Sequence, residues 1–224
     1  MRIIVFGATG MVGQGVLREC LLDPEVDQVL AVGRRPTGER DEKLRELVRK
    51  DLAGFSTGER ELAGFDACFF CLGVSSAGMT EGDYTRLTYD LTMAAATALV
   101  RLNPGMTFIY VSGAGTDSTE RGRTMWARVK GRTENALLKL PFGAAYMFRP
   151  AFIQPMHGIV SRTRLYRVLY AILGPLYPVW KFLFPAYVTT NEEVGKAMLR
   201  VAKHGAPKPV LESVDISALA GDAS

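Results

Sequence analysis

The sequence predicts an α/β fold, a doubly wound parallel sheet with helices on both faces and a small C-terminal substrate or lid subdomain. An apolar strand, a glycine-rich turn and a helix open the chain. Short apolar runs then alternate with helical patterns, as in βαβ units, until the composition changes near residue 155. We therefore expect a sheet domain at 1–155 and a C-terminal region at 156–224 packed on the same domain.

The composition is that of a soluble globular protein, with 224 residues, 48% hydrophobic and 22% charged. The net charge is +4, but lysines and aromatic side chains do not cluster together, so no nucleic-acid partner is expected. Binding of an anionic phosphate cofactor explains some of the excess arginine as well as a nucleic-acid partner would.

Three cysteines and the absence of a leader before the first strand predict a reducing cytoplasm. Cys68 and Cys71 lie three apart in an apolar run. Residues at that spacing on a strand point to opposite faces, which suits core packing and neither a disulfide nor a metal. We expect no metal site.

The first strand, Arg2–Phe6, ends at a glycine-rich turn that leads into a helix. Gly7 allows the tight turn, Gly10 lets the backbone approach a pyrophosphate, and Gly13 lets the helix pack closely on the sheet. The glycines are spaced G-x-x-G-x-x-G, and the alternative is an ordinary glycine-rich turn. The residues expected to bind a dinucleotide are Gly7, Ala8, Thr9, Gly10, Met11, Val12 and Gly13.

The second strand, Val26–Val32, leads into Arg34 and Arg35. In dinucleotide-binding folds, the residues at this position distinguish NAD from NADP. An acidic residue there would favour NAD, whereas arginine accommodates a 2′-phosphate. Asp27 lies at the wrong end of the strand for the acidic role. Two guanidinium groups therefore predict NADP(H), with a solvated basic turn as the alternative.

A charged helix is expected at Asp41–Lys50, with Leu44, Leu47 and Val48 as its buried stripe. It would deliver Asp51 and Leu52 to the adenine side of a cofactor, although an aspartate in a turn is the simpler interpretation.

A buried strand at Phe65–Leu72 ends at Gly73, whose backbone can approach the adenine ribose. This end of the strand adds three expected cofactor contacts, Cys71, Leu72 and Gly73.

The second half of the sheet domain starts with a long helix from Tyr84 to about Leu102. A strand at Thr107–Val111 ends at Ser112. In this architecture, catalytic residues lie at the carboxyl ends of strands, beside the nucleotide crevice. The next helix spans Trp126 to Glu134, and a further strand covers Ala145–Phe148. Further cofactor contacts are expected at Val111, Lys130, Pro150 and Ile153.

The chain resembles an atypical short-chain dehydrogenase/reductase, close to the Tat-interacting-protein-like and epimerase-like branch. The resemblance covers residues 1–155 and is more specific for fold and cofactor than for reaction. It implies a Rossmann fold in which Ser112 orients the substrate oxygen and Lys130 holds the nicotinamide ribose. The residues that carry it are Gly7–Gly13, Gly33-Arg34-Arg35, Cys71-Leu72-Gly73, Val111-Ser112 with Gly115, Val129-Lys130-Gly131 with Glu134, and Phe148-Arg149-Pro150.

The chain departs from that family at Trp126, four residues before Lys130, where the family has the tyrosine that transfers the substrate proton. An indole N–H donates a hydrogen bond but is no acid near neutral pH. Side chains elsewhere that could replace the tyrosine are Tyr84, Tyr89, Tyr110 and His157, and a packing or surface role is the simpler interpretation for each.

Residues 157–188 mix arginines, aromatics and prolines without a helical period. The uncharged run Val168–Trp180 is too short to span a membrane and is interrupted by Gly174 and two prolines. A substrate lid, a subunit interface in a homodimer and a membrane-surface segment remain open, with the lid favoured.

Thr190 and Glu193 form a capping-box pattern that starts a helix ending near His204. A short strand at Pro209–Glu212 and a final helical turn at Val214–Leu219 complete the predicted elements.

Two functions remain open. One is a weak or specialised NADP(H)-dependent oxidoreductase or epimerase-like enzyme acting on a small, partly apolar carbonyl or alcohol. The other is a non-catalytic NADP(H) sensor or scaffold, which the tryptophan at position 126 favours.

Overall fold

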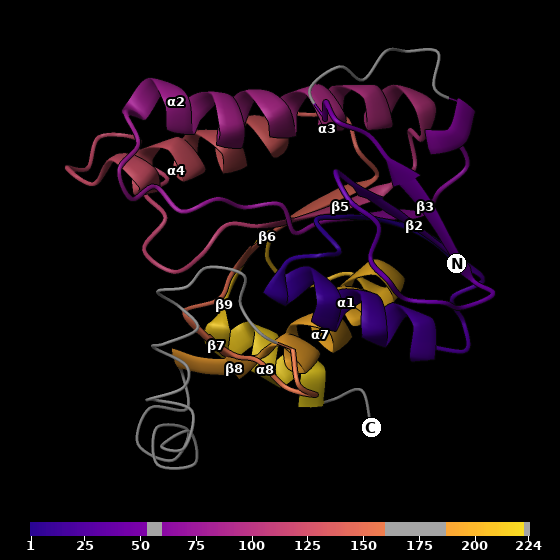
Figure 1. Ribbon diagram of the computed structural model, residues 1–224. Coiled ribbons are helices and arrows are strands. Elements are labelled where there is room, and N and C mark those ends of the chain that lie inside the picture. Colours follow the sequence, from indigo (N-terminus) through magenta and orange to yellow (C-terminus); the bar gives the residue numbers. More distant parts are fainter. Residues whose placement is uncertain (53–59, 160–186, 222–224) are drawn as a thin grey trace.

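The computed structural model describes residues 1–52, 60–159 and 187–221, and shows a parallel sheet between two layers of helices (Figure 1). Each neighbouring pair of strands in the seven-stranded sheet is parallel, which confirms the predicted fold class. In spatial order the strands are β3 (Leu44–Val48), β2 (Gln28–Gly33), β1 (Arg2–Phe6), β4 (Ala67–Phe70), β5 (Thr107–Val111), β6 (Ala144–Arg149) and β9 (Val210–Glu212).

The helices divide between the two faces of the sheet (Figure 1). One face carries α1 (Met11–Leu22), α7 (Asn191–His204) and α8 (Ser213–Gly221). The other carries α2 (Glu81–Thr85), a π-helical stretch (Arg86–Asp90), α3 (Leu91–Leu102) and α4 (Met125–Leu137). A 3-10 turn lies at Arg60–Leu62, and β7 (Phe152–Gln154) pairs with β8 (Val188–Thr190) in a small second sheet.

The core has two halves because side chains alternate across the sheet. Ile3 and Val5 of β1 pack on the α1 face, whereas Ile4 and Phe6 pack on the α3 face. The cysteines follow the same rule. Cys68 packs on the α3 face and Cys71 on the α1 face, as their spacing predicts, and burial raises the pKa of the Cys71 thiol to about 12.

The helix predicted at 41–50 is wrong, because Leu44–Val48 form the edge strand β3. Its backbone pairs with β2 in a parallel register, from Val29 opposite Leu44 to Gly33 opposite Val48. In so short a segment, apolar residues at 44, 47 and 48 fit a helix or a strand equally. The hydrogen-bonding edge of β2 decides between them, which is a tertiary effect outside the segment.

The capping box at the start of α7 is confirmed. The Glu193 amide donates to Thr190 Oγ1 at 2.9 Å, and the Thr190 amide donates to Glu193 Oε2 at 2.9 Å. Helix α7 crosses α1 so closely that a Cβ on Gly195 would lie 3.2 Å from Val16 Cα. Residues 187–221 thus add strand β9 and helices α7 and α8 to the seven-stranded sheet and its helical layer, and strand β8 to the small sheet.

The predicted lid, 157–188, lies largely at 160–186, outside the described residues. The lid and the boundary at residue 155 therefore stay predictions. Within the described ranges, no helix has the length and apolar character that a membrane crossing requires.

Candidate functional site

The sheet brings the predicted site residues to one edge. The strand order reverses direction between β1 and β4, and ligands bind in the crevice at such a switch point. The turn at Gly7–Gly10 follows β1, Arg34 and Arg35 follow β2, and Asp51 and Leu52 lie beyond β3. On the other side, Cys71, Leu72 and Gly73 follow β4, Val111 ends β5, Pro150 follows β6, and Ile153 lies in β7.

The turn after β1 is packed so tightly that two positions require glycine. Gly7 has a φ of +78°, and a Cβ there would lie 2.9 Å from the Cys71 carbonyl group. A Cβ on Gly13 would lie 2.1 Å from the Gly7 carbonyl oxygen. Both neighbours are backbone atoms, so a side chain could enter only if the turn itself moved.

The N-terminus of α1 is suited to an anion. Gly10 caps the helix without a side chain, and the first turn carries no acidic residue. The positive end of the helix dipole and the amides of the first turn thus point towards the crevice without competition from the helix's own side chains. A pyrophosphate fits this arrangement.

Arg34 and Arg35 are exposed at the end of β2. Within the described part of the chain, no carboxylate forms an ion pair with either guanidinium, so both can reach a ligand. Asp51 is also exposed, but Leu52 is buried with Leu62 and Phe65. The cofactor contact predicted for Leu52 would therefore have to use its backbone.

Ser112 is turned into the protein. Its hydroxyl donates to Glu134 Oε1 at 2.5 Å and lies 3.2 Å from the Phe148 carbonyl oxygen, and the residue is 4% exposed. Glu134 in turn pairs with Arg149, whose Nε donates to Glu134 Oε1 at 3.0 Å. The role predicted for Ser112, orienting a substrate oxygen, would require its hydroxyl to leave these partners.

The network around Glu134 was not predicted as a functional feature. The available clue was chemical: Ser112, Glu134 and Arg149 are polar residues that end or flank buried elements, where such groups need partners.

Lys130 is the ionisable group next to this network. Its Nζ donates to the carbonyl oxygen of Ser112, and a Cβ on Gly113 would lie 3.9 Å from it. Burial lowers the pKa of Lys130 to about 8, and the Glu134 carboxylate opposes that shift. The backbone position close to the Lys130 ammonium group is therefore occupied by Gly113, which offers no side-chain hydroxyl.

In the described part of the chain, Trp126 stands where the family pattern has its proton-transferring tyrosine. The Trp126 ring lies against Gly115, where a Cβ would be 3.5 Å from Cη2. Each of the four substitutes proposed from the sequence is engaged elsewhere. Tyr84 and Tyr110 are buried, Tyr89 lies under the Arg132 guanidinium at 4.3 Å, and His157 Nε2 contacts Glu192 Oε2 at 2.8 Å.

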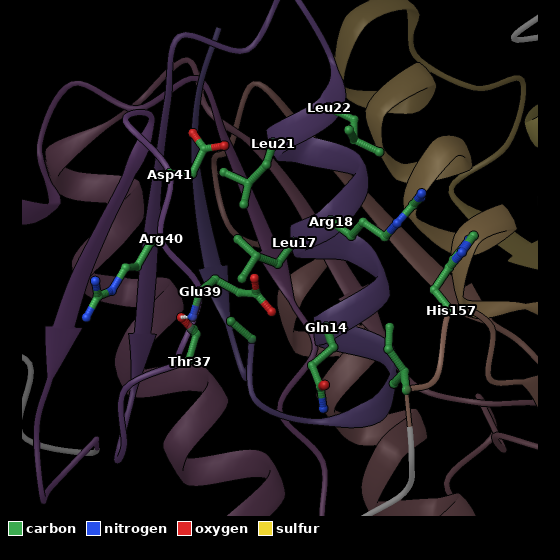
Figure 2. Close-up of a pocket in the computed structure, with 12 residues that line it drawn as sticks. Gln14, Leu17, Arg18, Leu21, Leu22, Thr37, Glu39, Arg40, Asp41 and His157 are labelled. Carbon is green, nitrogen blue, oxygen red and sulfur yellow. Dashed lines mark hydrogen bonds between the residues drawn. The ribbon is translucent and has the colours of Figure 1, made fainter.

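A separate cavity of about 370 Å³ lies on the outer side of α1 (Figure 2). It begins at Ala8 and runs between the helix, the segment from Thr37 to Asp41, and His157. Leu17 and Leu21 form an apolar wall, while Arg40 points away from the helix (Figure 2). The connection from β2 to β3 contains no helix, and its segment from Thr37 to Asp41 forms one wall of the cavity.

Comparison with known proteins also indicates that the chain belongs to a dinucleotide-binding family. Residues 3–122 match the model of the NAD-dependent epimerase/dehydratase family. The "Leucinostatins biosynthesis cluster protein T" of Purpureocillium lilacinum is 31% identical over 88% of this chain and 83% of its own. "Protein FMP52, mitochondrial" of Debaryomyces hansenii is 27% identical over 98% of this chain and 96% of its own.

Solved structures share the fold at low sequence identity. Gre2 of Candida albicans, in complex with NADPH, is 14% identical, with a TM-score of 0.71 over 95% of this chain and 78% of that one. WbmF of Bordetella bronchiseptica, in complex with NAD+, is 14% identical, with a TM-score of 0.62 over 99% of this chain and 77% of that one. One neighbour holds NADPH and the other NAD+, so these likenesses do not select between the two cofactors.

The predicted cytoplasmic location is contradicted, because several of these relatives are named mitochondrial proteins. The cysteine argument was too coarse: free thiols indicate that no disulfide is needed, and they do not distinguish one reducing compartment from another. Fold, crevice and family match together show that the chain belongs to the NAD-dependent epimerase/dehydratase family, within the atypical short-chain dehydrogenases/reductases.

Proposed function

We propose that this chain binds NADP(H) in preference to NAD(H) and acts as a weak or specialised oxidoreductase on a small, partly apolar carbonyl or alcohol. The observation that carries the proposal is the N-terminus of α1, which is capped by Gly10 and has no acidic residue in its first turn, together with two exposed arginines that have no carboxylate partner in the described chain. The helix end suits the pyrophosphate, and Arg34 with Arg35 suits the 2′-phosphate.

Arg34→Ala is expected to weaken NADPH binding by roughly tenfold or more, because a charge-assisted hydrogen bond is worth about 1.5–3 kcal/mol. NADH has no 2′-phosphate, so its affinity should stay nearly constant. Calorimetric titration of both cofactors measures the two effects, with Arg45→Ala on the exposed edge of β3 as the control. Equal affinities of the wild-type protein for NADH and NADPH would remove the proposed preference.

In this function Lys130 holds the ribose of the bound cofactor and supplies positive charge beside the substrate oxygen. NADP(H) supplies or accepts the hydride when bound. The chain has no phenol at position 126 to move the substrate proton. Because a positioned general acid or base contributes about a hundred- to ten-thousandfold in rate, we expect slow turnover.

A second candidate is a non-catalytic NADP(H) sensor or scaffold, and the inward orientation of Ser112 together with Trp126 favours it. In that case 157–188 would be the partner-facing element. The two candidates differ in one measurable respect. Incubation with NADPH labelled at the transferable hydrogen and a panel of carbonyl compounds yields labelled alcohol only if the chain is an oxidoreductase.

Trp126→Tyr tests what limits turnover. The variant should raise carbonyl reduction at least tenfold, since a phenol one turn before Lys130 restores a proton donor, while NADPH affinity changes little. Trp126→Phe is the matched control, because it makes a similar change in size without the hydroxyl. Equal turnover in both variants would mean that the missing phenol is not the limit.

A further inference from the structure

Glu134 is the most deeply buried carboxylate of the described residues, at 1% exposure. It lies four residues after Lys130 in α4, so the two side chains share one face of the helix. A buried carboxylate is stable as an anion only when hydrogen bonds and opposite charges surround it. Here Ser112 and Arg149 supply hydrogen bonds, and Arg149 supplies a charge.

These contacts join three elements at the crevice. Ser112 follows β5, Arg149 ends β6, and Glu134 lies in α4. Ser112 uses three polar groups here: the hydroxyl donates to Glu134, the carbonyl oxygen accepts from Lys130 Nζ, and the amide donates to the Phe148 carbonyl oxygen at 2.9 Å. The bond to Glu134 therefore acts together with the amide bond to Phe148 in holding the residue whose carbonyl receives Lys130.

We propose that Glu134 is a positioning residue for Lys130: it helps to fix the end of β5 so that the Ser112 carbonyl receives the ammonium group. The inference rests on the proposed function only in giving Lys130 a role towards the cofactor. Burial alone would favour the neutral amine, and the carboxylate acts against burial.

Other charged and titratable groups around α4 are engaged elsewhere or buried. The charge that raises the pKa of Lys130 is the Glu134 carboxylate. The groups on neighbouring elements are Glu81 of α2, paired with Arg128; Tyr89 of the π-helical stretch, stacked on Arg132; Tyr84 of α2 and Tyr110 of β5, both buried; and Glu212 of β9, paired with Arg149.

The test follows the Lys130 Nζ resonance through a pH titration of protein labelled with ¹³C,¹⁵N-lysine, assigned with Lys130→Arg. The wild-type protein should titrate near pH 8. Glu134→Gln should move the midpoint down by about one pH unit or more. The Cβ atoms of i,i+4 neighbours on a helix lie about 5–6 Å apart, and an opposite charge that close shifts a pKa by about 1–3 units. Glu134→Asp keeps the charge and should recover most of the shift.

Glu212→Gln is the matched control, because it removes a carboxylate that lies 3.4 Å from Arg149 and leaves Glu134 in place. Its Lys130 midpoint should equal that of the wild type. If Glu134→Gln does not fold, Glu134→Gln with Arg149→Met removes both buried charges and should still lower the midpoint. An unchanged midpoint in either folded variant would show that Glu134 only stabilises the fold, and the inference would be wrong.

NADPH titration of the same proteins separates the two proposals. Absence of NADPH binding by the wild-type protein would defeat the proposed function while the Lys130 titration still decided the role of Glu134. A normal midpoint in Glu134→Gln, with NADPH bound normally by the wild type, would defeat only the present inference.

Discussion

Gly131→Ala is expected to destabilise the protein by about 3 kcal/mol or more, at the upper end of what overpacking costs. A Cβ at this position would lie 1.8 Å from the Asp117 carbonyl oxygen and 2.5 Å from its carbonyl carbon. Both are backbone atoms, so no side-chain rotation relieves the overlap. Either α4 must move away from the turn at Asp117, or the turn must deform.

The turn resists deformation. The Asp117 carboxylate accepts from the Thr119 hydroxyl at 2.6 Å, from the Gly122 amide at 2.6 Å and from the Thr119 amide at 3.0 Å, and these hydrogen bonds hold the pKa of Asp117 below its usual value. The displacement should therefore fall on α4, which carries Lys130 next to Gly131. We expect NADPH affinity to fall together with stability, measured by calorimetry and by urea unfolding.

Gly105→Ala is the matched control for the added methyl group. Nothing lies within 4 Å of a Cβ at position 105, so the free energy of unfolding should change by no more than about 0.5 kcal/mol. If Gly131→Ala were as stable as this control, α4 could not pack against the Asp117 turn in the way described.

The sequence predicts the sheet because its strands are apolar runs that end in clear turn residues. Arg2–Phe6 and Thr107–Val111 appear at the predicted residues. The capping box at Thr190 likewise depends on residues three apart, a local relation that sequence reasoning can recognise. β3 could not be predicted in this way, because its conformation depends on pairing with β2.

The crevice, like the fold, can be predicted where it depends on strand positions and cannot be predicted where it depends on contacts between distant side chains. Parallel strands place their carboxyl ends at one edge, so strand positions alone predict that the turn at Gly7–Gly13, Arg34 and Ser112 lie along the same edge. The direction of a side chain is a different matter. Whether Ser112 faces the crevice or the interior depends on Glu134, 22 residues later, and on Arg149 beyond it.

The most costly single change outside the glycines should be Arg149→Ala. Its guanidinium pairs with Glu134, and the two side chains are 12% and 1% exposed. Removing the cation leaves a carboxylate in the interior with the Ser112 hydroxyl as its remaining hydrogen-bond donor among the described residues. Breaking one side of a buried ion pair costs about 3–5 kcal/mol, and we expect urea unfolding to show a loss in that range.

The exposed pair of Arg86 and Asp83 provides the control, because its side chains are 70% and 45% exposed. Solvent screens such a pair, so Arg86→Ala should cost less than about 1 kcal/mol. A loss of this size in Arg149→Ala would contradict the buried ion pair.

Replacing both buried partners should cost less than replacing one. In Glu134→Leu with Arg149→Met, no uncompensated charge remains in the interior, and apolar side chains of similar length fill most of the space. The double variant should therefore recover part of the loss of each single variant, with a coupling energy of about 1–3 kcal/mol in a double-mutant cycle. Ser112 loses Glu134 in this variant, and its hydroxyl keeps the Phe148 carbonyl oxygen, 3.2 Å away, as its acceptor. Additive losses in the cycle would mean that Glu134 and Arg149 stabilise the protein independently, contrary to the network that joins α4 to the ends of β5 and β6.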